Sequence, residues 1–224
     1  MTAFARLDPA VLEGFRALPT SGVSDALDRL GIAGAVEGLR PMLGGARIAG
    51  QAVTLAYLPV GRRGGTMGDF LHLAAPGDVI AIDMRGRTDC TCWGNILTEA
   101  ARARGIAGTV IDGANRDVGE SRDLGYPIWS RAGFMRTGKD RWVLEAANVP
   151  ICLGGVRVEA GDVLCADDNG VVCVPLSAAP EVLEAARAIG AKEGLIQAEL
   201  RAGVDLATAR ARHGYFALQG RAGA

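Results

Sequence analysis

Lysine and histidine are scarce in this chain of 224 residues, and their scarcity excludes two classes of catalytic site. The two lysines are Lys139, in the polar stretch GKDR, and Lys192, in a pattern typical of an amphipathic helix. A Schiff-base lysine needs a desolvated setting that lowers its pKa, and neither position predicts one. The two histidines, His72 and His213, are too few for a zinc site built from imidazoles. His72 could carry a proton, although a packed or surface histidine is more common.

Cysteine spacing predicts neither a disulfide framework nor a zinc site, because the five cysteines are odd in number and match no ligand pattern. Cys165 and Cys173 fall in strand-like runs, where cysteine acts as a small hydrophobe. Cys90 and Cys92 lie near the candidate site described below, where we also expect packing. The G-x-G-x-x-G and P-loop signatures are absent, so the sequence does not predict a nucleotide cofactor.

Clustered positive charge and long apolar runs are also absent. The net charge is −1 and the arginines are interleaved with acids, so we do not expect nucleic acid as a partner. No apolar run approaches the roughly 20 residues that span a bilayer, and the N-terminus lacks a signal-peptide pattern. We therefore expect a cytoplasmic protein with no membrane contact. An apolar content of 49% with 22% charged residues suits a sizeable globular core.

The pattern along the chain predicts a single α/β domain over residues 1–224. N-terminal helices are expected within 10–30, at 10–18 behind an Asp8–Pro9 start and at 21–30 before Gly31. C-terminal helices are expected within 181–212. Between them lies an α/β core at 47–174, with a short helix at 69–75, a helix at 94–104, a strand start at 127–129, and strands at 47–57, 79–83, 107–112, 142–146, 156–158, 163–166 and 170–174.

A functional site can be built on the stretch Trp93–Glu120, which we expect to form a helix, a strand and a polar turn. The free N–H groups of a helix that begins at Gly94 can hold an anion, and glycine lets a ligand approach the backbone. Arg116 and Asp117 follow the strand, and ligands gather at the carboxyl ends of strands in open α/β sheets. The structural alternative is an Arg116–Asp117 surface pair, with Asn95 as a helix cap.

The available chemistry is therefore that of carboxylates, arginine and backbone amides. An arginine can bind a carboxylate in bidentate fashion, and an adjacent carboxylate can hold a hard metal ion. This set favours Mg²⁺ or Mn²⁺ over zinc and suits substrates that are carboxylates or oxo acids. The ion would act as a Lewis acid on a carbonyl group.

The chain resembles the family that contains 4-hydroxy-4-methyl-2-oxoglutarate aldolase and the regulator of ribonuclease E activity A. The resemblance covers nearly all of the chain and rests on the order and spacing of several segments. It implies a swivelling-type α/β/β/α sandwich with N- and C-terminal helices, and homotrimers or homohexamers with sites between subunits. The matching segments are SGVSDALDRLGIAGAVEGLRPMLGGARIAGQAVTL, PGDVIAID, WGN followed by RDVGE, NVPICLGGVRVEAGDVLCADDNGVVCVP and AKEGLIQAELRAGVDL.

The resemblance also implies roles for individual residues. Arg116 matches an arginine that binds pyruvate or its enolate, and Asp117 matches a metal ligand. Glu193 matches an acid of a C-terminal helix that reaches the metal of a neighbouring subunit, with a solvated helix face as the alternative. The segment that binds the pyruvyl group through backbone amides corresponds to Gly94, Asn95, Ile96 and Leu97.

One position departs from the aldolase pattern. The aldolases carry an acidic residue, then twenty residues, then the Arg-Asp pair, and here the acid is replaced by Asn95. Asparagine cannot act as a general base, so a different base, a different substrate and a weakened activity all remain open. In the loop 61–65, Arg62 or Arg63 could reach a second substrate carboxylate, although solvated loop charges are the plainer interpretation.

These observations lead to one main hypothesis, with Arg116 and Asn95 as the candidate catalytic positions. It is a class II, divalent-metal-dependent aldolase that cleaves 4-hydroxy-2-oxo acids to pyruvate, with oxaloacetate decarboxylation as a side activity. The alternatives are a non-catalytic binding protein that resembles the ribonuclease E regulator, and a related lyase or isomerase of sugar acids.

Overall fold

A long central strand organises the computed structural model, which describes residues 4–62 and 64–217. This strand, β3, runs over Ile48–Pro59 and is buried along most of its length. Its first residues pair antiparallel with β10 and its middle pairs parallel with β4. β3 therefore belongs to both halves of a nine-stranded sheet of order β1-β11-β10-β3-β4-β5-β6-β2, with β7 attached to β3.

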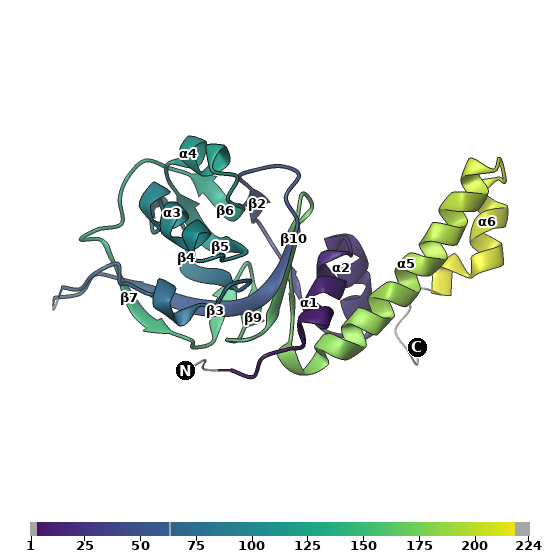
Figure 1. The fold of residues 1–224 in the computed structure, drawn as a ribbon, viewed down its shortest axis with the longest axis horizontal. Coiled ribbons are helices and arrows are strands. Elements are labelled where there is room, and N and C mark those ends of the chain that lie inside the picture. The colour runs from purple at the N-terminus through teal and green to yellow at the C-terminus, as the bar shows by residue number, and fades with distance from the viewer. Residues whose placement is uncertain (1–3, 63, 218–224) are drawn as a thin grey trace.

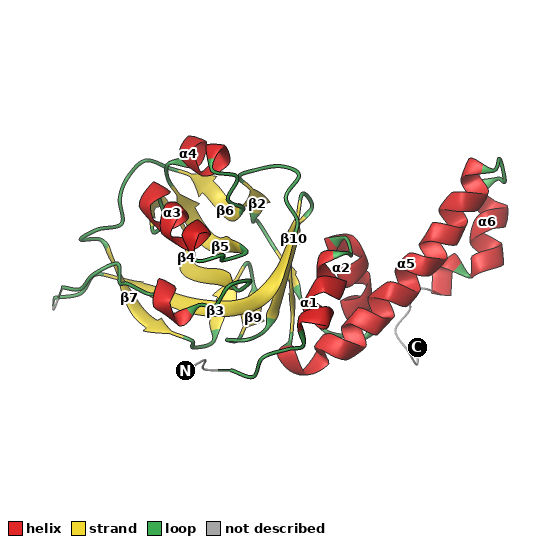
Figure 2. Ribbon diagram, in the orientation of Figure 1, coloured by secondary structure: helices red, strands yellow, loops and turns green. Residues whose placement is uncertain are grey.

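The strands and helices follow the expected order along the chain (Figures 1 and 2). The other strands are β1 (Ala35–Val36), β2 (Arg40–Pro41), β4 (Val79–Thr91), β5 (Gly108–Asn115), β6 (Ile128–Gly133), β7 (Trp142–Ala147), β8 (Ile151–Leu153), β9 (Val156–Val158), β10 (Val163–Asp167) and β11 (Gly170–Val174). The α-helices are α1 (Pro9–Arg16), α2 (Thr20–Arg29), α3 (Asn95–Ala103), α4 (Val118–Asp123), α5 (Ala179–Arg201) and α6 (Leu206–His213).

Three buried clusters separate four layers. One lies between α3 and the parallel strands β3 to β6, and it includes Trp93 and Ile111. A second fills the space between these strands and the layer of β8 to β11, around Trp129. The third joins β10 and β11 to α1, α2 and α5 around Phe15. The expected α/β/β/α sandwich with N- and C-terminal helices is therefore confirmed.

Local signals in the sequence explain several element boundaries. The Asp8 carboxylate accepts a hydrogen bond from the Ala10 N–H at 2.8 Å, and Pro9 is the first residue of α1, as expected. Gly31 follows the end of α2 with a φ of +70°. The expected βαβ unit is present, because β4 and β5 pair in parallel on either side of α3 in the sequence.

Other boundaries differ from the expectation. The turn after β5 contains a six-residue helix, α4, and the expected helix at 69–75 is a single 3-10 turn, η1, at Leu71–Leu73. β4 does not end at residue 83. It resumes beyond Arg85 and Gly86, which both have positive φ, and continues to Thr91. The short strands β1, β2 and β8 were not predicted.

The C-terminal helices form an arm on the side of the molecule opposite α3 and α4 (Figure 1). The first part of α5 packs against α1 and α2, and α6 folds back on the end of α5. None of the helices within the described ranges combines the length and apolarity that a bilayer crossing requires.

Candidate active site

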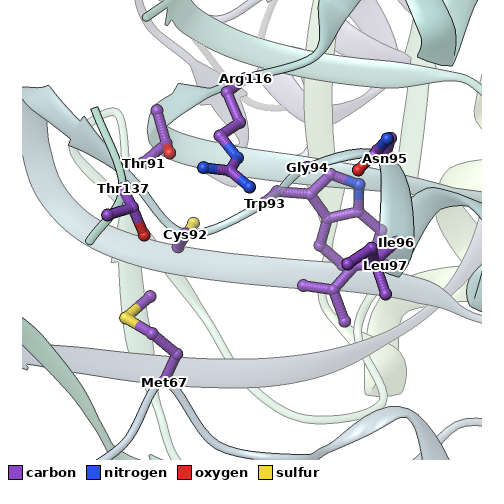
Figure 3. A pocket seen from close by; sticks show the side chains of 10 residues that line it. All are labelled: Met67, Thr91, Cys92, Trp93, Gly94, Asn95, Ile96, Leu97, Arg116 and Thr137. Atoms are coloured by element: carbon purple, nitrogen blue, oxygen red, sulfur yellow. The ribbon is translucent and has the colours of Figure 1, made fainter. Parts of the chain in front are cut away.

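A small cavity lies where β4 ends and α3 begins. Its volume is about 160 Å³, below the roughly 300–1,000 Å³ typical of pockets for drug-sized ligands, so it suits a small metabolite. It lies beside the carboxyl ends of the parallel strands β4 and β5, where ligands gather in such sheets. The lining residues are Met67, Thr91, Cys92, Trp93, Gly94, Asn95, Ile96, Leu97, Arg116 and Thr137 (Figure 3).

Arg116 directs its guanidinium group into this cavity. Figure 3 shows the group among the labelled side chains, between Cys92 and Trp93. Its backbone N–H donates to the Trp93 carbonyl at 2.9 Å, which ties the start of the turn after β5 to the segment before α3. Its Nε lies 3.3 Å from Asp117 Oδ2. No acceptor in the described part of the chain binds the two terminal nitrogens, so they are available for a carboxylate ligand.

Asp117 links the two helices that begin at the site. Its backbone starts α4 in the left-handed region, with a φ of +55°, which is uncommon for a residue other than glycine. Its carboxylate does not cap α4. Instead, Oδ2 accepts the N–H of Asn95, in the first turn of α3, at 3.0 Å. The other oxygen, Oδ1, has no hydrogen bond to the described residues, and the side chain is 25% exposed.

Gly94 is required by close packing rather than by its backbone angles. Its φ is −154°, which any residue can adopt. A Cβ atom at this position would lie 2.6 Å from Asp117 Oδ2 and 3.0 Å from Arg116 Nε. The two charged side chains can therefore rest against the start of α3 only because residue 94 has no side chain.

The start of α3 presents free amide groups, as the sequence predicted. The first intrahelical bond runs from the Thr98 N–H to the Gly94 carbonyl at 3.0 Å, so the N–H groups of Ile96 and Leu97 have no partner within the helix. The Asn95 N–H is already bonded to Asp117. The idea that Asn95 caps the helix is wrong, because Gly94 occupies the cap position and no side chain caps this end.

The cavity offers little acid–base chemistry. None of the lining side chains is a carboxylate or an imidazole, among the residues that the structure describes. Burial raises the pKa of the Cys92 thiol, so this group stays protonated at neutral pH. His72 is exposed and does not line the cavity. Glu120 is exposed on α4.

Three lining residues were not identified from the sequence. Thr91 and Thr137 meet in an isolated bridge between the end of β4 and the segment after β6, and Met67 enters from the loop after β3. Met67 and Thr137 lie outside the Trp93–Glu120 stretch in the sequence. Thr91 lies just before that stretch but belongs to no recognisable motif. Of the loop arginines, Arg62 is exposed and does not line the cavity, and Arg63 lies outside the described residues.

A divalent metal fits this site through one carboxylate. No group of three or more His, Cys, Asp or Glu side chains gathers as a metal site within the described ranges. Mg²⁺ is commonly held by one or two carboxylates with several retained waters, and the free Oδ1 of Asp117 matches that mode. Glu193 is on α5, and α5 packs against α1 and α2, on the opposite side from α3 (Figure 1). Its role in a neighbouring subunit stays a prediction.

Comparison with known proteins matches this chain to one family model and to several relatives. The model of the RraA-like family, described as Aldolase/RraA, matches residues 20–173. Protein DlpA of Legionella pneumophila is 34% identical over 210 residues, which are 92% of this chain and 34% of that protein. The chain thus spans about a third of this relative's length. A protein of Halalkalibacterium halodurans named "Putative 4-hydroxy-4-methyl-2-oxoglutarate aldolase" is 35% identical over 181 residues, covering 77% of this chain and 80% of the relative.

Two solved structures share the fold. An uncharacterized protein from Pseudomonas syringae pv. tomato matches with a TM-score of 0.87 at 38% identity, covering 92% of this chain and all of that one. RraAS2 of Streptomyces coelicolor, an unusual member of the RNase ES inhibitor RraA protein family, matches with a TM-score of 0.79 at 30% identity, covering 85% and 97% of the two chains. The family model matches most of the length of this chain, and the chain therefore belongs to the RraA-like family.

Proposed function

We propose that this protein is a divalent-metal-dependent carbon–carbon lyase that cleaves 4-hydroxy-2-oxo acids and releases pyruvate. The observation that carries the proposal is the Arg116 guanidinium, which faces the cavity with both terminal nitrogens free. The unpaired N–H groups of Ile96 and Leu97 lie at the same cavity. The name of the Halalkalibacterium halodurans relative supports the same class of reaction.

These groups match the two ends of a pyruvyl unit. A 2-oxo acid carries a carboxylate next to a carbonyl, and cleavage moves negative charge onto the carbonyl oxygen as the enolate forms. Arg116 binds the carboxylate, and the amides at the start of α3 donate to oxygen atoms that gain charge. Donors fixed in this way stabilise the transition state without reorganising.

Asp117 is the residue that would hold the metal. The Asn95 N–H fixes Oδ2, and Oδ1 is left free at the edge of the site. A bound Mg²⁺ or Mn²⁺ would supply Lewis-acid polarisation of the substrate's 2-oxo group. The Asn95 N–H at the start of α3 holds the Asp117 carboxylate in place. A displacement of α3 would therefore also displace the carboxylate that would bind the metal.

The proton balance of the cleavage needs a carrier. The C4 hydroxyl loses a proton, the C3–C4 bond breaks and its electron pair goes to the pyruvate enolate. C3 then takes up a proton, which gives pyruvate and a second carbonyl product. No lining side chain among the described residues is suited to take the first proton. In our proposal, water in the cavity carries it.

Oxaloacetate decarboxylation reaches the same enolate without that step. Loss of CO₂ leaves the electron pair on C3, and no hydroxyl has to be deprotonated. A site that binds pyruvate well but lacks a base should therefore decarboxylate oxaloacetate more readily, relative to its aldol cleavage, than an enzyme with an acid at position 95.

The proposal is tested by measuring pyruvate release from 4-hydroxy-2-oxo acids. We expect release with Mg²⁺, its loss with EDTA, and a decrease of about 10²-fold or more in the Asp117→Ala variant. Asp123→Ala is the matched control, because Asp123 is an exposed carboxylate on the same helix, α4. Release that is insensitive to both EDTA and Asp117→Ala would refute the metal-dependent mechanism.

A second candidate is a binding protein that performs no chemistry. It is favoured by Asn95, by the lack of a base in the cavity, and by the similarity to RraAS2, which belongs to a family of RNase ES inhibitors. Binding to purified ribonuclease E separates the two candidates. Binding at micromolar concentration, together with no turnover of any oxo acid, would favour this second function.

A further inference from the structure

We propose that Thr98 and Ser121 are positioning residues that hold the two helix starts of the active site at a fixed separation. The inference rests on the proposed function, because it concerns the alignment of the groups that would stabilise the enolate. The free amides belong to the start of α3, whereas Arg116 and Asp117 lie at the start of α4. A substrate that contacts both helix starts requires them at one separation.

The two hydroxyl groups occupy matching places on their helices. Thr98 Oγ1 lies 3.1 Å from the carbonyl oxygen of Gly94, the residue that precedes α3. Ser121 Oγ lies 3.1 Å from the carbonyl oxygen of Asp117, the residue that precedes α4. Thr98 and Ser121 are 0% and 2% exposed, and their hydroxyl oxygens are 3.1 Å apart. Each hydroxyl therefore contacts the start of its own helix and the hydroxyl of the other helix.

The hydrogen atoms of this cluster join α3 to α4. The indole Nε1 of Trp93 can only donate, and it bonds Thr98 Oγ1 at 2.9 Å. In one arrangement, Thr98 donates to Ser121, which donates to the Asp117 carbonyl. In the other, Ser121 donates to Thr98, which donates to the Gly94 carbonyl. If each hydroxyl donated only to its own helix, two buried oxygen atoms would face each other without a hydrogen between them, which is unfavourable.

The backbone of Asp117 shows why the start of α4 has to be held. Its φ of +55° lies in the left-handed region, which a residue other than glycine keeps only where its surroundings fix it. The N–H and the hydroxyl of Ser121 both bond its carbonyl oxygen, at 3.0 Å and 3.1 Å. The Asn95 N–H bonds its carboxylate. Because Ser121 also contacts Thr98, both the backbone and the side chain of Asp117 are tied to α3.

The Ser121→Ala substitution tests the hydroxyl pair with little risk to the fold. It keeps the N–H bond to the Asp117 carbonyl, Thr98 can still donate to the Gly94 carbonyl, and alanine favours a helix more than serine does. The probes are pyruvate and oxalate, and oxalate is a planar analogue of the pyruvate enolate. In calorimetry with Mg²⁺, we expect binding to weaken about tenfold for oxalate and less than about twofold for pyruvate, because misalignment costs most where charge has developed. The kcat of pyruvate release should fall about tenfold with little change in KM.

Two substitutions of Thr98 separate the role of its hydroxyl from that of its methyl group. Thr98→Val keeps the volume and should weaken oxalate binding as Ser121→Ala does, with lower stability because the Trp93 N–H loses its acceptor. Thr98→Ser keeps the hydroxyl and should retain the oxalate affinity that Thr98→Val loses. Thr54→Val is the matched control, because Thr54 lies on β3, is also 0% exposed and donates its hydroxyl hydrogen to the Val149 carbonyl. It should lower the unfolding temperature without changing the ratio of the oxalate and pyruvate affinities.

The outcomes separate this inference from the function on which it rests. If the wild type releases pyruvate, but Ser121→Ala and Thr98→Val change oxalate and pyruvate binding equally or not at all, the inference is wrong and the proposed function stands. Loss of oxalate affinity in Thr98→Ser would also overturn the inference, because the methyl group would then be what the site requires. If the wild type binds neither probe and cleaves no oxo acid, the proposed function fails and the inference falls with it.

Discussion

Gly94, Arg116 and Asp117 constrain one another at the centre of the site. The Arg116 guanidinium and the Asp117 carboxylate occupy the space where a Cβ of residue 94 would be. The carboxylate is held there by the Asn95 N–H. Small changes at residue 94 should therefore displace both charged groups while the fold survives.

The Gly94→Ala substitution tests this arrangement. We expect kcat/KM for pyruvate release to fall by about 10²-fold, because misplaced groups at a reaction centre lose that order of rate. Thermal unfolding should shift little. Gly119→Ala on α4 is the control, because its Cβ would meet no atom within 4 Å and its φ is not positive. Equal activity of Gly94→Ala and wild type would contradict the contact geometry.

Asn95 is the residue at which the chain departs from the aldolase pattern. Asn95→Asp places a carboxylate at the cavity wall, where a base is otherwise missing among the described residues. General-base catalysis contributes about 10²–10⁴-fold, so we expect aldol cleavage to rise several-fold or more. Oxaloacetate decarboxylation needs no base and should change less. A parallel change in both activities would show that position 95 does not take part in proton transfer.

The sequence predicted the part of the site that is local in the chain. Gly94, Arg116 and Asp117 are joined by one βαβ unit, whose parallel pairing follows from its pattern. Met67 and Thr137 come from other segments, and contacts at long sequence separation bring them to the cavity. No local residue pattern encodes such contacts.

At the scale of elements, alternation of apolar residues predicted the long strands well. It missed β1 and β2, which have two residues each and carry too little pattern to detect. It ended β4 early, because Arg85-Gly86-Arg87 interrupts the apolar run. In the structure these residues form an irregularity with positive φ at 85 and 86, after which pairing to β5 resumes.

The last residue of β10 anchors the start of α2 through a buried carboxylate. Asp167 is 5% exposed and accepts hydrogen bonds from the Thr20 N–H at 2.9 Å and the Thr20 hydroxyl at 2.6 Å. Burial alone would raise the pKa of Asp167, but the Thr20 and Asn169 donors outweigh it and lower the pKa. The lowered pKa means that the charged form stabilises the fold.

Asp167→Asn should therefore lower the free energy of unfolding in a pH-dependent way. The stabilisation by Asp167 is complete above the unfolded pKa of about 3.9 and is lost as pH falls through the lower folded pKa. We expect a loss of about 1–3 kcal/mol at pH 7 that shrinks below about pH 3.9, measured by urea unfolding. Asp123→Asn, at an exposed position, is the control. A pH-independent difference would contradict this role.

At the scale of the whole molecule, the C-terminal arm leaves apolar side chains uncovered. Leu195 is 53% exposed, Leu206 is 46% exposed and Phe216 is 82% exposed. Exposed apolar side chains on a projecting arm suit packing against another copy of the chain. Together with the family resemblance, this supports the proposal of a homotrimer or homohexamer, in which Glu193 could reach a neighbouring site.

Light scattering tests the assembly. We expect a mass of three or six chains, and a smaller mass when Leu195→Glu places a charge on the arm. Gln197→Glu, an exposed neighbour on the same helix, should leave the mass unchanged. A monomeric wild type would rule out sites shared between subunits and any role for Glu193 at the metal.

The most direct measurement is a crystal structure of the protein soaked with pyruvate and Mg²⁺. We expect the pyruvate carboxylate within hydrogen-bond distance of the terminal nitrogens of Arg116, its oxo oxygen toward the amides of Ile96 and Leu97, and the metal on Asp117. Pyruvate bound away from Arg116, or a metal bound without Asp117, would contradict it.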